Sequence, residues 1–229
     1  MNSEKIVQSF VNNFNYLAED AKLLRSLANS PLHFNSFRRT KLCRTAILLL
    51  VLSLEALINR CLDHFIQGEL RDFVLKREEK FSLIDKFQLI SILSSGKEFD
   101  REKSPWGHLK ELCQIRNDYV HPKHDRLAIY RINEKKEFDS LSLVQIPAGL
   151  EYEDSFGIKH KVKEKHLQYS YVKIPKDPYT LLPEHVDKIN AAVKDIVVEL
   201  DKLLDGKLTK DNWIGSDQLK IIYPPGSTF

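Results

Sequence analysis

Seven consecutive apolar residues, 46–52, lie in the middle of a long helical pattern and constrain the fold more than any other feature of the chain. A helix that is apolar on every side is buried in a protein or spans a membrane. Ser53 and Glu55 interrupt the apolar stretch 45–58, which is shorter than the roughly 20 residues that a membrane span needs. We therefore expect a core helix from about residue 35 to residue 65, and no association with a membrane.

Four further stretches, with apolar residues at spacings of three and four, predict helices around this core helix. Ser82 is a suitable N-cap for one of them, Pro122 breaks another, and Pro183 lies near the start of the last. The expected ranges are 3–29, 81–93, 105–121 and 183–205. Together they predict a mainly α protein with an antiparallel helical bundle.

The character of the sequence changes between residues 127 and 174, where it favours strands. The expected strands are 127–132, 141–146 and 167–174, separated by turn-forming prolines and glycines. About 50 residues bury too little surface to fold alone. We therefore expect a single domain of 229 residues, with a β-rich insertion at 125–178 before the last long helix and a C-terminal tail at 207–229.

Composition limits the function without choosing it. The net charge of +3 is mildly basic and permits a polyanionic partner. The three cysteines, Cys43, Cys61 and Cys113, are widely spaced inside expected helices, which is typical of reduced core residues. The first residues lack a cationic start followed by an apolar stretch. We expect a cytoplasmic protein.

The helix that ends at Pro122 carries the motif Arg116-Asn117-Asp118-Tyr119-Val120-His121. A guanidinium can hold a phosphate, and an imidazole can move a proton near neutral pH. Five residues along a regular helix separate Arg116 and His121 by about 140° around the axis and about 7.5 Å along it. Pro122 could release His121 from helical geometry, or a two-fold partner could bring its own motif to the same cleft. The spacing favours a dimeric site.

Arg116 points toward the apolar side of its helix, where an unpaired guanidinium is costly to bury. Glu55 is the expected partner, and this ion pair could simply join two helices or could orient Arg116 toward a phosphate. For His121 the alternative to catalysis is a helix-terminating histidine bonded to a backbone carbonyl. Asp118 is expected to be solvated. Tyr119 is expected to pack, with stacking on a base as the alternative.

The run Ser53-Leu54-Glu55-Ala56-Leu57-Ile58-Asn59 and the later motif that ends at Pro122 resemble the HEPN superfamily (higher eukaryotes and prokaryotes nucleotide-binding). The signature of this family is Arg, a polar residue, three more residues and then His. The resemblance covers roughly residues 35–122 and the C-terminal helix. It implies an all-α bundle that forms a homodimer, with two motifs across one cleft.

Many members of this superfamily are metal-independent endoribonucleases, often toxins or defence proteins, and a toxin would be paired with an antitoxin. Other members are non-catalytic modules that bind nucleotides or proteins. One subset is modified on a tyrosine two positions after the motif histidine. This chain has Lys123 at that position, so we do not expect that form of regulation.

The chemistry that follows is cleavage of single-stranded RNA without a metal or another cofactor. Neutral His121 would take the proton of the ribose 2′-OH, and Arg116 would hold the phosphate oxygens as negative charge builds. Asn117 would position the phosphate or His121, with Glu55, Asp118 and Tyr119 in support. The products would be a 2′,3′-cyclic phosphate and a 5′-hydroxyl. DNA lacks the nucleophile and would not be cut.

Two basic segments are candidate RNA-binding surfaces, and Lys123 is a further candidate contact. The first lies in the opening turns of the core helix, where cations oppose the helix dipole. Its members are Arg38, Arg39, Lys41 and Arg44. They form either a solvated basic face or a phosphate-facing patch.

The second basic segment lies in the expected insertion and has lysines at alternate positions. They are Lys159, Lys161, Lys163 and Lys165. An extended strand would present all four to one side, and Tyr169 and Tyr171 follow with the same period. Basic residues beside aromatic residues suit single-stranded RNA. The alternative is an edge strand that its lysines protect from aggregation.

Overall fold

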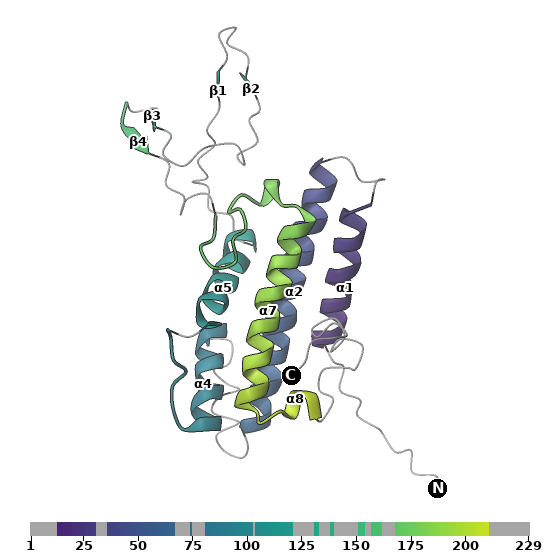
Figure 1. Ribbon diagram of the computed structural model, residues 1–229, viewed down its shortest axis with the longest axis vertical. Coiled ribbons are helices and arrows are strands. Elements are labelled where there is room, and N and C mark those ends of the chain that lie inside the picture. Colours follow the sequence, from purple (N-terminus) through teal and green to yellow (C-terminus); the bar gives the residue numbers. More distant parts are fainter. Residues whose placement is uncertain are drawn as a thin grey trace.

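Five helices make up most of the described chain in the computed structural model, which covers residues 13–30, 36–66, 74, 81–102, 104–120, 131–132, 138–139, 151–153, 157–161 and 168–210. The helices are α1 (Asn13–Ala28), α2 (Ser36–Phe65), α4 (Leu83–Ser95), α5 (Trp106–Val120) and α7 (Pro183–Leu203). They lie along the long axis of the molecule, with α4 and α5 following one another on one side of α2 and α7 (Figure 1). The predicted mainly α class is confirmed.

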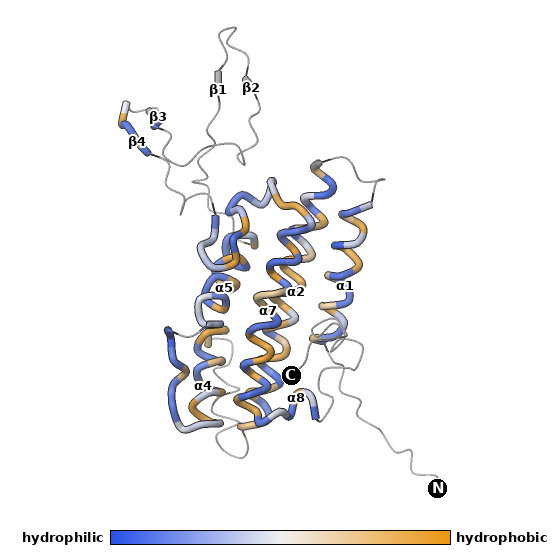
Figure 2. The backbone as a smooth tube through the Cα atoms, viewed as in Figure 1, coloured by the Kyte–Doolittle hydropathy of each residue, from blue (hydrophilic) through white to orange (hydrophobic). Residues whose placement is uncertain are grey.

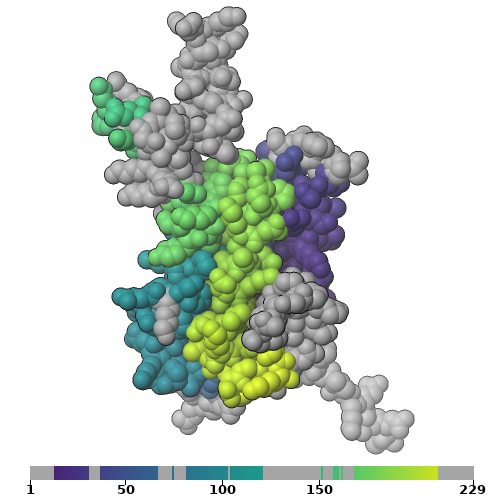
Figure 3. All heavy atoms as spheres, viewed as in Figure 1, coloured from purple at the N-terminus to yellow at the C-terminus, as the bar shows by residue number. Residues whose placement is uncertain are grey.

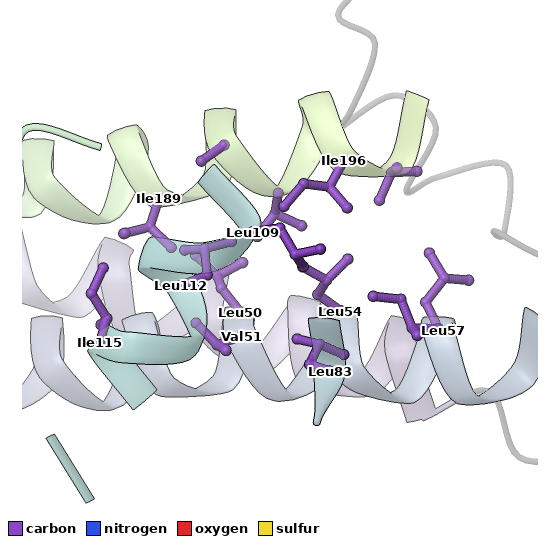
Figure 4. Packing of buried hydrophobic residues seen from close by; sticks show 14 of the residues in the cluster. Leu50, Val51, Leu54, Leu57, Leu83, Leu109, Leu112, Ile115, Ile189 and Ile196 are labelled. Carbon is purple, nitrogen blue, oxygen red and sulfur yellow. The ribbon is translucent and has the colours of Figure 1, made fainter. Parts of the chain in front are cut away.

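The apolar stretch in the middle of α2 contributes to the core, as expected. Leu109, Leu112 and Ile115 of α5 are fully buried between α2 and α7 (Figure 4). Along α2 and α7, hydrophobic and hydrophilic residues alternate with helical periodicity (Figure 2), which gives each helix a face for the core. Seen from one side, α1 and α7 cover most of α2 (Figure 3).

The length argument against a membrane span is wrong for the complete helix. Between Phe37 and Phe65, α2 is long and apolar enough to cross a membrane by length and composition, and half of its most apolar stretch is buried against the rest of the protein. The core helices of soluble proteins have the same properties. In this structure the buried side of α2 contacts α1, α4, α5 and α7.

The helix ends follow from local sequence signals. The Ser82 hydroxyl accepts a hydrogen bond from the Asp85 backbone N–H, and the Asp85 carboxylate accepts from the Ser82 backbone N–H, which completes a capping box. Gly96 ends α4 in the left-handed conformation. After α7, the four-residue helix α8 (Lys207–Lys210) buries Leu208. The rest of the predicted first helix and of the C-terminal tail lies outside the described residues.

Helices α2 and α7 run in the same direction, which is compatible with the expected antiparallel bundle because alternate helices of such a bundle are parallel to each other. Thr40 near the start of α2 donates a hydrogen bond to the Tyr179 carbonyl oxygen, just before α7 begins. His64 at the end of α2 lies 3.0 Å from the Lys207 ammonium, just after α7 ends. The segment 81–120 returns the chain to the end where α2 starts, so α7 repeats the direction of α2. Helix α1 runs antiparallel to both (Figure 1).

The expected β-rich segment contains two antiparallel strand pairs among the described residues. Strand β1 (Arg131–Ile132) pairs with β2 (Phe138–Asp139), and β3 (Glu151–Glu153) pairs with β4 (Lys159–Lys161). The strand expected at 141–146 lies outside the described residues.

The prediction of a strand at 167–174 is wrong, because the described residues 168–174 form a turn. The Tyr169 backbone N–H donates to the Ile174 carbonyl oxygen, and Lys173 has a φ of 54°. Tyr169, Val172 and Ile174 are buried in the helical core instead of lying on one face of a strand.

Candidate functional site

The Arg116 guanidinium is held at the surface where α5 crosses α2. Leu112 and Ile115, which lie near Arg116 on α5, are buried in the core. Their burial fixes the rotation of α5 about its own axis. Arg116 Nη1 then reaches Glu55 Oε2 over 2.9 Å. The side chains of Arg116 and Glu55 stay 38% and 25% exposed, so the ion pair is open to solvent and to a ligand.

Asn117 holds the same guanidinium from a second side. Its Oδ1 accepts from Arg116 Nε over 3.3 Å and from Nη2 over 3.2 Å. A guanidinium has five N–H donors, and these bonds together with the Glu55 bond use three of them. Among the described residues, the remaining donors, one on Nη1 and one on Nη2, have no partner. Such a pair of donors matches the geometry of a phosphate.

Asp118 and Tyr119, the next two described motif residues after Asn117, anchor the end of α5. Tyr169 Oη donates to Asp118 Oδ2 over 2.8 Å, so Asp118 is partly buried and paired, whereas a solvated side chain was expected. Tyr119 is only 5% exposed, and its hydroxyl donates to the Pro175 carbonyl oxygen over 3.2 Å. The packing role of Tyr119 is confirmed. Both bonds join the end of α5 to the turn at 168–175.

A buried carboxylate that sequence reasoning missed holds this turn in place. Glu111 on α5 accepts three backbone N–H groups, from Ser170 at 2.6 Å, Tyr171 at 2.7 Å and Val172 at 2.9 Å. Three donors compensate for burying a charge that is only 8% exposed. No local signal identifies this role, because the partners lie about 60 residues later in the chain.

Several predicted site residues lie outside the described residues. They are His121, Lys123, Lys163 and Lys165. His121 directly follows Val120, the last residue of α5.

The two described lysines of the second basic segment lie on β4. Lys159 pairs in register with Glu153, and Lys161 pairs with Glu151. Opposite charges at paired positions stabilise a hairpin, so the pairing of Lys161 with Glu151 gives Lys161 a possible structural role. Tyr169 does not share their surface, because it is buried in the core.

The first basic segment is divided by the helix that carries it. Lys41 and Arg44 line a cavity of about 240 Å³, whereas Arg38 and Arg39 do not. The other described lining residues are Phe37, Thr40, Pro178 and Tyr179. Sequence reasoning missed Phe37 and Tyr179. The aromatic residue beside the cations was a usable signal for Phe37, but Tyr179 is brought there by a contact 139 residues away along the chain.

The described residues leave the candidate site resting on Arg116, Glu55 and Asn117. Among them, no three histidine, cysteine, aspartate or glutamate side chains gather as metal ligands. Cys113, one turn before Arg116, is a free thiol, and burial raises its pKa to about 11, so it stays neutral at pH 7. No family model matches the chain, and no curated protein and no solved structure matches it either.

Proposed function

We propose that this protein is a metal-independent endoribonuclease of the HEPN type that cleaves single-stranded RNA. The observation that supports this proposal most is the Arg116 guanidinium, which Glu55 and Asn117 orient while two of its N–H donors have no partner among the described residues. A group that is oriented in advance stabilises developing negative charge without reorganisation, and one such donor contributes about 2.7–4 kcal/mol. The HEPN-like bundle with a β-rich insertion is part of this proposal.

His121 carries out both proton transfers of the reaction, first as a base and then as an acid. His121 takes the proton of the ribose 2′-OH, and the 2′ oxygen forms a bond to phosphorus as the bond to the 5′ oxygen breaks. The leaving 5′ oxygen takes a proton from the imidazolium, which restores the neutral ring. Arg116 holds the non-bridging oxygens throughout. Proton transfer by a positioned histidine contributes about 10²–10⁴-fold.

We propose that two copies of the chain form the site. Two residues five positions apart on a regular helix, as Arg116 and His121 are in the sequence, would not share a face, so a second motif across a two-fold axis would supply the missing group. Leu52 lies one turn from Glu55, and Val120 lies one turn from Arg116; they are 40% and 52% exposed. Burial of these apolar side chains between two copies would stabilise a dimer. We also propose that the protein acts in the cytoplasm as a toxin or defence effector, and that a toxin would have an antitoxin protein as its partner.

The alternative is a non-catalytic HEPN module that binds a nucleotide or a protein. The observation that favours it is the ion pair itself, because Arg116 already joins α5 to α2 through Glu55. In that case Arg116 is a structural strut, and His121 caps the end of a helix.

Cleavage of a labelled single-stranded RNA in EDTA tests the proposal. Wild type, His121→Ala and Arg116→Gln are compared, with Lys110→Gln, an exposed position on α5, as the matched control. We expect wild type and Lys110→Gln to produce 2′,3′-cyclic phosphate ends, and both motif variants to lose cleavage while keeping the oligomeric state of wild type. Cleavage that requires Mg²⁺, or equal cleavage of single-stranded DNA, would contradict the mechanism.

A further inference from the structure

The cavity at the start of α2 combines the two chemistries that a nucleotide presents. Tyr179 is 61% exposed and offers an aromatic face, and Lys41 and Arg44 supply positive charge for a phosphate. None of the described lining residues is acidic. Aromatic platforms beside cations are the usual means of binding single-stranded nucleic acid.

The parts of this cavity are fixed before any ligand binds. Tyr179 lies in the one-turn 3₁₀ helix η4 (Pro178–Thr180), whose start is capped by Asp177 Oδ1 accepting from the Tyr179 backbone N–H over 2.9 Å. The Thr40 hydroxyl donates to the Tyr179 carbonyl oxygen over 3.3 Å and ties η4 to α2. The Tyr179 ring is therefore presented from a backbone that is held at two points.

The aromatic ring on α2 has a different role from Tyr179. The Lys41 ammonium lies 4.1 Å from the centroid of the Phe37 ring, a cation–π contact that positions the ammonium. One face of Phe37 is thus occupied, and Tyr179 is the platform for a base. The volume of about 240 Å³ is below the range of drug-sized pockets, which suits one base and not a larger ligand.

Helical geometry connects this cavity to the Arg116 site. Phe37, Arg44 and Glu55 lie within about 20° of one another around the axis of α2, and Arg44 is about 16 Å from Glu55 along it. Both features therefore lie on one side of the same helix. A single strand anchored in the cavity can follow this side of α2 toward the guanidinium that Glu55 orients.

We infer that this cavity binds one unpaired nucleotide of a single-stranded RNA, with the base stacked on Tyr179 and its phosphate held by Lys41 and Arg44. The inference rests on the proposed function for the kind of ligand, but it does not require that the RNA be cut. It requires an unpaired base, so a duplex of the same sequence lacks this contact.

Fluorescence anisotropy with a labelled single-stranded 2′-O-methyl RNA tests the inference, because this probe lacks the 2′-hydroxyl and stays intact. The full chain is compared with Tyr179→Ala, Tyr179→Phe and Arg44→Gln. Tyr16→Ala and Lys22→Gln are the matched controls; Tyr16 is 65% exposed on α1, outside the cavity. Circular dichroism confirms that every variant is folded.

We expect Tyr179→Ala to weaken binding about five-fold to 150-fold, the effect of losing one base–aromatic stack. Tyr179→Phe and both controls should stay within about two-fold of wild type, since stacking needs only a ring. Arg44→Gln should reduce the dependence of log Kd on log salt concentration by about 0.7, the value for one phosphate contact on a single strand. A duplex probe should show no effect of Tyr179→Ala.

Two results would overturn the inference: Tyr179→Ala binding like wild type, or wild type failing to bind the probe at low salt. The nuclease proposal fails separately. Tyr179-dependent binding without any RNA cleavage supports the cavity and contradicts the nuclease. Cleavage that depends on His121, together with binding that Tyr179→Ala does not change, supports the nuclease and contradicts the role of the cavity.

Discussion

Arg116 on α5 and Glu55 on α2 form an ion pair of 2.9 Å between residues 61 positions apart in the chain. A pair that is this exposed to solvent contributes little to stability, typically less than about 1 kcal/mol. Its effect on orientation is larger, because the Glu55 and Asn117 oxygens together restrict the guanidinium from two sides. The pair therefore allows a test that separates a positioning role from a purely structural one.

Glu55→Gln should lower the kcat of RNA cleavage by about 10- to 100-fold, because a misplaced guanidinium no longer meets the reacting phosphate. The free energy of unfolding, measured by urea denaturation, should change by less than about 1 kcal/mol. Glu199→Gln is the matched control, since Glu199 also pairs with a cation and its side chain is 22% exposed. A variant that loses stability but keeps its kcat would identify the pair as a structural staple.

Glu111→Gln should destabilise the fold by about 1.5–3 kcal/mol, the range for hydrogen bonds to a charged group. The carboxylate accepts three N–H groups, and an amide would turn a donor toward one of them. Urea denaturation gives the change, with Glu98→Gln as an exposed control on the loop before α5. A loss below about 0.5 kcal/mol would mean that the turn at 168–175 does not depend on Glu111.

His185 should make stability depend on pH. Its Nδ1 accepts the Leu182 backbone N–H over 2.9 Å at the start of α7, which requires the neutral ring, and burial lowers its pKa below the usual 6.5. The unfolded chain therefore binds more protons than the folded chain below pH 6.5. The stabilisation is complete above that value and is lost as pH falls through the lowered folded pKa.

Urea denaturation of wild type and His185→Gln at pH 8, 7, 6 and 5 measures this effect. We expect the difference in unfolding free energy between the two proteins to shrink as the pH falls below 6.5. It should stay constant above about pH 7.5, where the histidine is neutral in both states. A difference that is constant from pH 8 to pH 5 would show that His185 keeps its ordinary pKa.

The helical part of the fold could be predicted because its signals are local. Ser82 and Gly96 cap α4 through contacts within a few residues, and the apolar centre of α2 needs burial wherever it lies. The turn at 168–175 could not be predicted this way, because Glu111 supplies its hydrogen bonds from about 60 residues away. The alternation of residue types in this segment is typical of a strand, but the hydrogen bonds to the distant Glu111 carboxylate stabilise a turn instead.

The candidate site also has one part that could be predicted from the sequence and parts that could not. An arginine on an apolar face needs a carboxylate, so the Arg116–Glu55 pair could be predicted from the cost of burying a charge. The cavity could not, since Tyr179 reaches it only through the packing of η4 on Thr40. Asp118 was misjudged for the same reason, because its partner Tyr169 lies 51 residues later in the chain.

Two tyrosines anchor the end of α5 immediately before His121, and their hydroxyl groups should differ in importance. Tyr169→Phe removes a bond to the Asp118 carboxylate and should cost about 1.5–3 kcal/mol. Tyr119→Phe removes a bond to a neutral carbonyl and should cost about 0.5–1.5 kcal/mol. Tyr171→Phe, which changes a 62% exposed side chain, is the control.

Hydrogen exchange separates this anchoring from general destabilisation. If the two bonds hold the end of the motif helix, Tyr169→Phe should speed amide exchange at residues 117–120 more than in the centre of α2, because local opening requires less free energy than global unfolding. Uniformly faster exchange across α2 and α5 would instead mean that Tyr169 stabilises the bundle as a whole. In that case the position of His121 would not depend on the turn at 168–175.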